Sequence, residues 1–308
     1  MLQKGWLTQK SPRCFYAVGS VAGASAQTIS TFTIPDDANF ISFLCVGAGG
    51  PGAGGDPANG SAGGGGAGGI MNVIYSTRTI PKTIYLMPGY GSLGAGPTLT
   101  GFTGGQSFVG LYPQGPSPAS TQLACANGGQ TGNIPSGGAG GTAAITACTL
   151  ASRALSFRGI SGNSGSDGIN GAGAGTNALY YNNSAWGCGG ASGGGTASNG
   201  SSVLPSTNIN PFWNNNSSTV LISGGVTDLT LGGTGQNGYS TVDNVCPFGA
   251  LSLPLICLGG GGGGGSATTG GNGGNGGLGS GGGGGGMGGV TGGSGGNSGP
   301  GFIIVEWW

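Results

Sequence analysis

Long glycine-rich tracts constrain this chain more than any other feature of its sequence. They lie at residues 47–69, 159–175, 187–200 and 259–301. From Gly159 to Gly171, glycine recurs at every third position. In the last tract larger residues are separated by multiples of three positions, at Asn272, Asn275, Leu278, Met287 and Val290. The pattern then shifts by one position and continues at Thr291, Ser294, Asn297 and Pro300. Three residues per turn is the geometry of the polyproline-II helix, which glycine also adopts.

A helix of this kind makes no internal hydrogen bonds, so its buried backbone groups must pair with neighbouring helices. Ordering glycine costs more backbone entropy than ordering any other residue, and only a dense bundle with nearly every backbone group paired offsets that cost. The alternative is a flexible glycine linker. Flexible linkers show no regular spacing of residues, whereas these tracts keep a spacing of three residues and carry Leu, Met and Val. The pattern favours a packed polyglycine-II bundle.

Apolar segments with β-type residues accompany the glycine tracts. Residues 28–34 alternate apolar and polar side chains, which is typical of a half-buried strand. We predict strands near 28–46, 70–88 and 302–308. The fold class is therefore mostly β and irregular, with β-strands framing a packed bundle of polyglycine-II helices and little or no α-helix. Residues 28–308 form this glycine-rich domain, and residues 1–27 form an N-terminal arm or attachment peptide.

The chain has few groups suited to acid–base or metal chemistry. Its 308 residues include seven Lys and Arg, seven Asp and Glu and no histidine, so its formal net charge is zero. Imidazole, a common general base and metal ligand, is therefore absent. Nucleic acids and anionic membrane surfaces attract clustered positive charge, which the sequence lacks. We predict a protein that is not an enzyme, holds no cofactor or metal, binds no nucleic acid and does not insert into a membrane. A carboxylate pair for glycoside hydrolysis is the enzymatic alternative, and nothing in the sequence indicates it.

Seven cysteines lie far apart in the sequence and form no Cys-x-x-Cys pair. An odd number fits a complete disulfide framework poorly, so we predict small buried thiols, with disulfides as the alternative. The apolar segment from Pro247 to Leu258 is either a core strand or a surface that packs against a partner chain.

The opening and closing segments resemble a known family. Residues 32–55 read FTIPDDANFISFLCVGAGGPGAGG and residues 299–308 read GPGFIIVEWW. Both resemble the glycine-rich domain of bacteriophage tail fibre and receptor-binding (adhesin) proteins, and TGGQSFVGLY and LACANGGQTG resemble its middle segments. Members of that family with polyglycine-II packing present variable loops to the host surface. The resemblance implies a virion component, and the 27-residue N-terminus matches no fibre-attachment domain.

Two segments between glycine tracts are rich in asparagine and aromatic residues. Aromatic faces beside amide groups stack on sugar rings and bond their hydroxyl groups. The alternative is that these aromatic side chains cap a bundle that has few large side chains of its own. The predicted receptor-binding residues are Tyr180, Tyr181, Asn182, Asn183, Trp186, Asn210, Phe212, Trp213, Asn214 and Asn215.

Together these observations predict a non-enzymatic virion structural protein, assembled in the host cytoplasm, that belongs to a tail fibre or receptor-binding apparatus. Its expected partners are other virion proteins, further copies of itself (a trimer is one option) and a host surface glycan or outer-membrane protein. A capsid decoration or head-fibre protein is the first alternative. An ice-binding or cell-surface glycine-rich protein is the second, and the irregular aromatic segments argue against ice binding.

Overall fold

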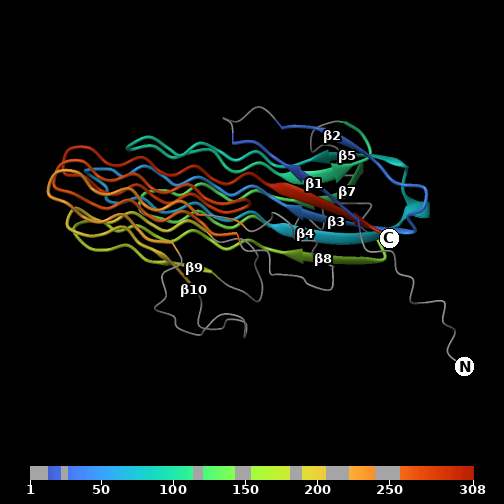
Figure 1. Ribbon diagram of the computed structural model, residues 1–308. Helices are drawn as coiled ribbons and strands as arrows, with labels where there is room; N and C mark the ends of the chain where they lie inside the picture. Colours follow the sequence, from blue (N-terminus) through green and yellow to red (C-terminus); the bar gives the residue numbers. More distant parts are fainter. Residues whose placement is uncertain are drawn as a thin grey trace, which may run out of the picture.

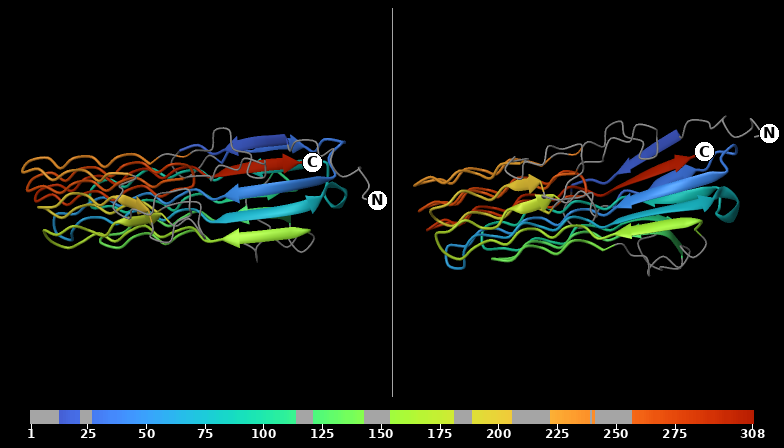
Figure 2. Two further views of the ribbon diagram at one scale, coloured as in Figure 1. Left: turned by 60° about the horizontal axis from the view of Figure 1, so that its bottom comes forward. Right: turned by 90° about the horizontal axis from the view of Figure 1, so that it is seen from below.

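The computed structural model describes residues 13–21, 27–113, 121–142, 154–180, 189–205, 222–238, 240 and 257–308. The β-strands of two antiparallel sheets gather at one end of an elongated molecule, and the glycine tracts run side by side from these strands to the other end (Figures 1 and 2). Of the elements that the described residues form, only η2 (Thr77–Thr79) is helical. The predicted fold class, mostly β and irregular with little or no α-helix, is confirmed.

The two sheets are built from strands far apart in the sequence. The five-stranded sheet has the order β1 (Arg13–Val18), β11 (Phe302–Trp307), β3 (Phe40–Val46), β4 (Ile70–Ser76) and β8 (Ser156–Ile160). The four-stranded sheet has the order β2 (Ser30–Thr33), β5 (Thr83–Met87), β6 (Ser107–Gly110) and β7 (Gln122–Ala126). Every pairing within these two sheets is antiparallel.

An apolar core lies between the sheets. Phe43 of β3 and Tyr75 of β4 are fully buried there, with ring centroids 6.1 Å apart. The Tyr75 hydroxyl donates a hydrogen bond of 2.7 Å to the carbonyl oxygen of Leu123, so its polar group is satisfied inside the core. From β11, Trp307 packs on Phe32 of β2 with centroids 5.4 Å apart. The closing strand therefore joins both sheets.

Part of the expected N-terminal arm belongs to the fold. Residues 13–18 form β1, which pairs with β11 from Arg13↔Trp307 to Val18↔Phe302. Ala17 is buried, and Phe15 packs on Phe32 with centroids 5.5 Å apart. The arm was expected because residues 1–27 hold three of the seven Lys and Arg residues and end in a stretch of small residues. The partner strand of β1 lies almost at the other end of the sequence.

Among the described cysteines, Cys45, Cys125 and Cys257 are buried, in agreement with the sequence-based expectation. Burial raises the pKa of the Cys257 thiol to about 12, so this group stays protonated at neutral pH. Cys14 of β1 is disulfide-bonded, so the prediction of thiols alone is wrong for this residue. Of the apolar segment ending at Leu258, only the last two residues are described, and both are buried.

The glycine segments pair through backbone hydrogen bonds that repeat every three residues. The amides of Gly47, Gly50 and Ala53 donate to carbonyl groups between residues 63 and 69. The amides of Gly49, Gly52 and Gly55 donate instead to residues 293, 296 and 299, in the last tract. Successive residues of one segment thus bond to different neighbours, as expected for polyglycine-II helices in a packed bundle.

Glycine is required because the segments approach closely. A Cβ atom added to Gly52 would overlap the carbonyl oxygen of Gly283, and one added to Gly65 would overlap that of Gly50. Most glycines of the bundle have a neighbouring carbonyl group in the same position. The bundle therefore has a backbone core, in contrast to the side-chain core between the sheets.

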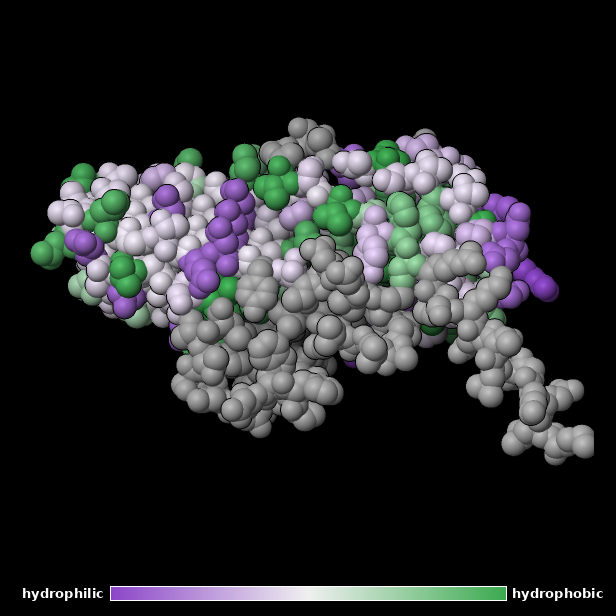
Figure 3. Space-filling model, in the orientation of Figure 1, coloured by the Kyte–Doolittle hydropathy of each residue, from purple (hydrophilic) through white to green (hydrophobic). Residues whose placement is uncertain are grey.

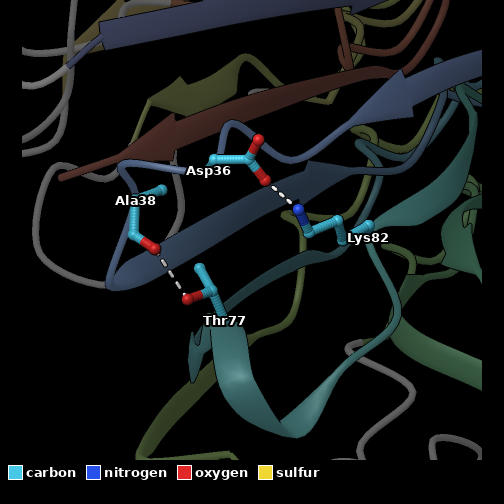
Figure 4. Close-up of polar contacts among 4 residues, drawn as sticks. All are labelled: Asp36, Ala38, Thr77 and Lys82. Atoms are coloured by element: carbon cyan, nitrogen blue, oxygen red, sulfur yellow. Dashed lines mark hydrogen bonds and ion pairs between the residues drawn. The ribbon is translucent and has the colours of Figure 1, made fainter.

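At the end of the two sheets away from the bundle, two connections contact each other (Figure 4). They are residues 34–39, between β2 and β3, and residues 77–82, between β4 and β5. The Thr77 hydroxyl donates a 2.7 Å hydrogen bond to the carbonyl oxygen of Ala38, and Lys82 forms an ion pair with Asp36. Both charged side chains are largely exposed, so the ion pair contributes at most about 1 kcal/mol. No helix formed by the described residues is long and apolar enough to cross a membrane.

Thr98 occupies a backbone conformation that suits glycine. Its φ is 64°, the only positive φ among the described non-glycine residues. It follows Pro97 in a turn closed by a 3.1 Å bond from the Leu99 amide to the Gly96 carbonyl, and a β-branched residue is strained there. We expect Thr98→Gly to stabilise the protein by about 1 kcal/mol, because lost strain outweighs the added chain entropy. Thermal unfolding, with Thr100→Gly as the matched control, measures this. A lower midpoint for Thr98→Gly than for the wild type would contradict it.

Candidate functional site

Of the ten predicted receptor-binding residues, nine lie outside the described residues: Tyr181, Asn182, Asn183, Trp186, Asn210, Phe212, Trp213, Asn214 and Asn215. Tyr180 is described by its backbone alone, as the last residue of β9 (Ala178–Tyr180). The role of these residues stays a prediction.

The two predicted segments start from one small sheet. β9 pairs in parallel with β10 (Val203–Pro205), and Tyr180 is the register partner of Pro205. Because the strands are parallel, the chain leaves both of them at the same end, toward residues 181–186 after β9 and toward residues 208–216 after β10. That Tyr180 and Pro205 are neighbours could not be inferred from sequence positions so far apart.

This sheet is fixed to the bundle by a small apolar cluster. Ala178 and Val203 are buried together with Ala191, Ile222 and Leu258. Ile222 also forms an antiparallel bridge with Val203, with a 2.9 Å hydrogen bond from the Val203 amide to the Ile222 carbonyl. We call β9, β10 and Ile222 the loop base. A packed base gives both segments a defined starting position on the bundle.

At the bundle end farthest from the sheets, three turns stack side by side. These tip turns are residues 228–231, 266–269 and 288–291, and parallel bridges join them at their first and last positions. The buried Ser266 hydroxyl bonds the Thr269 carbonyl oxygen at 2.7 Å within its turn. Large apolar side chains lie on the outside: Leu229 is 81% exposed and Val290 69%. Figure 3 shows apolar and polar atoms close together at this end.

Behind the tip turns, a trough of about 350 Å³ crosses the surface of the bundle. Two rows of side chains form its walls, and each row takes one residue from each of three neighbouring segments. Pro97 adds an apolar group to the lining. The first row is Leu231, Thr269 and Thr291, the second row is Thr234, Asn272 and Ser294, and the floor is Gly232, Gly270, Gly271 and Gly292.

The rows follow from the period of three. Leu231, Thr269 and Thr291 are aligned by the parallel bridges of the tip turns, and each residue of the second row lies three positions further along its segment. The sequence period identified Asn272 and Ser294 as phase-keeping residues. It did not show that their segments are neighbours, and it did not include Thr234.

Asparagine side chains tie the outer segments of this face together. The Oδ1 atom of Asn272 accepts a 2.9 Å hydrogen bond from the Ser294 amide. Asn275 accepts one of 3.0 Å from the Asn297 amide, and Asn237 one of 2.9 Å from the Asn275 amide. These side chains supply acceptors to backbone amides at the bundle surface, where no further glycine segment can.

Acidic side chains of the bundle also bond the backbone. The carboxylate of Asp56 accepts hydrogen bonds from the Ala58 amide at 2.8 Å and from the Asn59 side chain at 2.6 Å, and these bonds lower its pKa. Asp167 accepts a 2.6 Å bond from the Gly137 amide. No group of three or more His, Cys, Asp or Glu that could hold a metal ion occurs among the described residues.

Two further cavities contrast with the trough. One, of about 320 Å³, has Gln106, Asn127 and Thr142 in its lining and also has a glycine floor. Its side chains bond one another: Gln106 donates to the Asn127 Oδ1 atom at 2.7 Å, and Asn127 donates to the Thr142 hydroxyl at 2.9 Å. The other, of about 330 Å³, lies at the sandwich beside Tyr75 and Arg78.

Comparisons with known proteins agree with this architecture. A family model described as a glycine-rich domain matches residues 24–308, which include the whole bundle and every described strand except β1. No curated protein matches the chain. Since the family model covers most of the sequence, the chain belongs to the glycine-rich domain family.

Proposed function

We propose that this chain is a non-enzymatic structural protein of a virion, a component of a bacteriophage tail fibre or receptor-binding apparatus that displays two Asn/aromatic segments to a host surface. The observation that carries the proposal is the loop base: Tyr180 and Pro205 are register partners, so both segments start from adjacent positions on the bundle. Residues that act on one ligand must reach it together, and a shared base provides this.

The rest of the architecture supports display. Backbone packing holds the glycine segments rigidly, and a rigid support lowers the entropy lost when the segments bind. The segments contain Tyr181, Trp186, Phe212 and Trp213, and aromatic residues of this kind dominate binding energies at interfaces. Several copies on one particle strengthen individually weak contacts. The resemblance of residues 32–55 and 299–308 to phage adhesins supplies the virion context.

The proposal is tested in two steps. Immunogold labelling of particles with antibody against this chain is expected at the tail fibres or tail tip. Purified Tyr181→Ala/Trp213→Ala protein is expected to bind host cells at least tenfold more weakly than the wild type, which corresponds to about 1.4 kcal/mol. Phe102→Ala is the matched control, because Phe102 is an aromatic residue 71% exposed and lies outside the loop base.

Three outcomes would contradict the proposal. Label over the head would favour a capsid decoration protein, and absence of label from every particle would remove the virion context. Equal binding by the double variant and the wild type, with unchanged circular dichroism, would show that the two segments do not carry attachment.

A further inference from the structure

We propose that the trough behind the tip turns binds a segment of a neutral polysaccharide. This inference goes beyond the proposed function, since the trough lies at the tip of the bundle and shares no residue with the loop base. It concerns residues other than the two Asn/aromatic segments. The argument rests on the shape of the trough, the hydrogen-bonding groups in its walls and a comparison with the cavity at Gln106.

The shape suits an extended chain. Positions three residues apart on a polyglycine-II helix lie about 9 Å apart, so the two rows stand on either side of a channel that runs across the segments. The floor consists of glycines, which present no side chain to the channel. A volume of about 350 Å³ is near the lower limit for small-molecule sites, and we expect it to hold about one or two sugar rings.

Three of the four floor amides are already bonded within the bundle, and Gly292 is the exception among these described residues. The Gly232 amide donates to the Thr269 carbonyl at 2.9 Å, and the Gly270 amide donates to the Thr291 carbonyl at 2.9 Å. The Gly271 amide donates to the Gly264 carbonyl at 2.7 Å. With these three backbone amides bonded inside the bundle, recognition of a ligand falls mainly to the side chains of the walls.

The walls carry polar groups that are available for a ligand. Within the described part of the chain, the hydroxyls of Thr234, Thr291 and Ser294 make no hydrogen bond. Asn272 uses its Oδ1 atom to accept from the Ser294 amide, which fixes the side chain and leaves the two N–H donors of its amide. Hydroxyl groups both donate and accept, so these walls match a ligand rich in hydroxyl groups.

The lining contains no charged side chain. A charged ligand entering the trough would lose hydration without gaining an opposite charge, which disfavours anionic polymers. Leu231, 62% exposed, and Pro97 add apolar surface to the lining. Sugar rings present hydroxyl groups at their edges and apolar C–H groups on their faces, and a neutral polysaccharide meets both features.

The cavity at Gln106 has a similar lining, but several of its polar side chains bond one another. There, glycines again form a floor, but the wall side chains bond one another from Gln106 through Asn127 to Thr142. That network uses donors and acceptors of three of the polar side chains in the lining, whereas Thr103 and Gln130 lie in the same lining outside it. The trough keeps the hydroxyls of both wall rows open, and this difference favours the trough over the other cavity as the ligand site.

The test uses the purified full chain and affinity electrophoresis through gels that contain dextran, mannan, galactan or the anionic polygalacturonate. We expect at least one neutral polymer to retard the wild type. Thr234→Val/Thr291→Val removes two hydroxyls while keeping the side-chain shape, and we expect its dissociation constant to rise at least tenfold. Thr142→Val, in the cavity at Gln106, is the matched control and should bind like the wild type.

Several results would overturn the inference. These are no retardation by any neutral polymer, preference for polygalacturonate, equal binding by the double variant, or an equal loss in Thr142→Val. The Tyr181→Ala/Trp213→Ala protein separates this inference from the proposed function. If it keeps both polysaccharide binding and cell attachment, the proposed role of the two segments fails and the trough assignment stands. If this variant loses cell attachment and no neutral polymer retards the wild type, the proposed role of the two segments stands and the trough assignment fails.

Discussion

Gly283→Ala is expected to destabilise the protein by about 3 kcal/mol, the upper end of the usual cost of overpacking, although it adds a single methyl group. A Cβ atom at this position would overlap the carbonyl oxygen of Gly261 and lie 2.7 Å from its carbonyl carbon. Rotamer changes cannot relieve this overlap, because both partners are backbone. The Gly283 carbonyl also accepts a 2.7 Å hydrogen bond from Gly296, and its amide donates to Gly274 at 2.9 Å. Moving one segment therefore disturbs several others.

Chemical denaturation followed by circular dichroism measures this effect, with Gly96→Ala as the control. The nearest atom to a Cβ at Gly96 is Leu99 Cδ1, at 3.7 Å, an ordinary van der Waals distance. The control is expected to change stability by less than about 1 kcal/mol, because no backbone lies in the way. Equal stabilities of the two variants would show that close backbone packing does not hold the bundle together.

Phe43→Ala is expected to cost about 3–5 kcal/mol, the usual range for a buried phenylalanine. Phe43 is fully buried and packs against Tyr75 across β3 and β4. The consequence should reach the bundle. β3 continues directly into residues 47–55, and the hydrogen bond from the Gly47 amide to the Gly69 carbonyl, 2.9 Å long, extends the β3–β4 ladder into the first glycine pair.

We therefore expect one cooperative transition in which sheets and bundle unfold together. Hydrogen exchange of glycine amides in residues 47–69, compared with exchange in β3 and β4, follows both parts at once. Phe102→Ala, at a residue 71% exposed, is the control and should stay within about 0.5 kcal/mol of the wild type. A bundle that keeps its protection after Phe43→Ala unfolds the sheets would contradict this coupling.

Much of the fold could be predicted from local patterns. The period of three in the glycine tracts predicted polyglycine-II packing, because glycine spacing directly determines where backbones can approach. Strands were predicted near residues 28–46, and the structure places β2 and β3 there. β1 was missed because its stability comes from pairing with β11, about 290 residues away, and nothing local in residues 13–18 reports that partner.

For each candidate site, the sequence predicted some of the residues and the structure showed which segments lie together. Composition indicated Asn/aromatic segments suited to binding, but only the pairing of Tyr180 with Pro205 placed their starting points together. The phase of Asn272 and Ser294 was visible in the sequence, while the trough required Leu231 and Thr234 from a third segment.

The sequence by itself determined the kind of contacts this protein makes: backbone packing in glycine tracts, side-chain packing in a few strands and few charges at neutral pH. Only the tertiary structure decided which segments are neighbours. The physical reason is that polyglycine-II helices offer nearly identical backbone surfaces to one another, so their pairing order is not encoded in any single tract. It is set by the sheets from which the segments emerge and by the turns that join them.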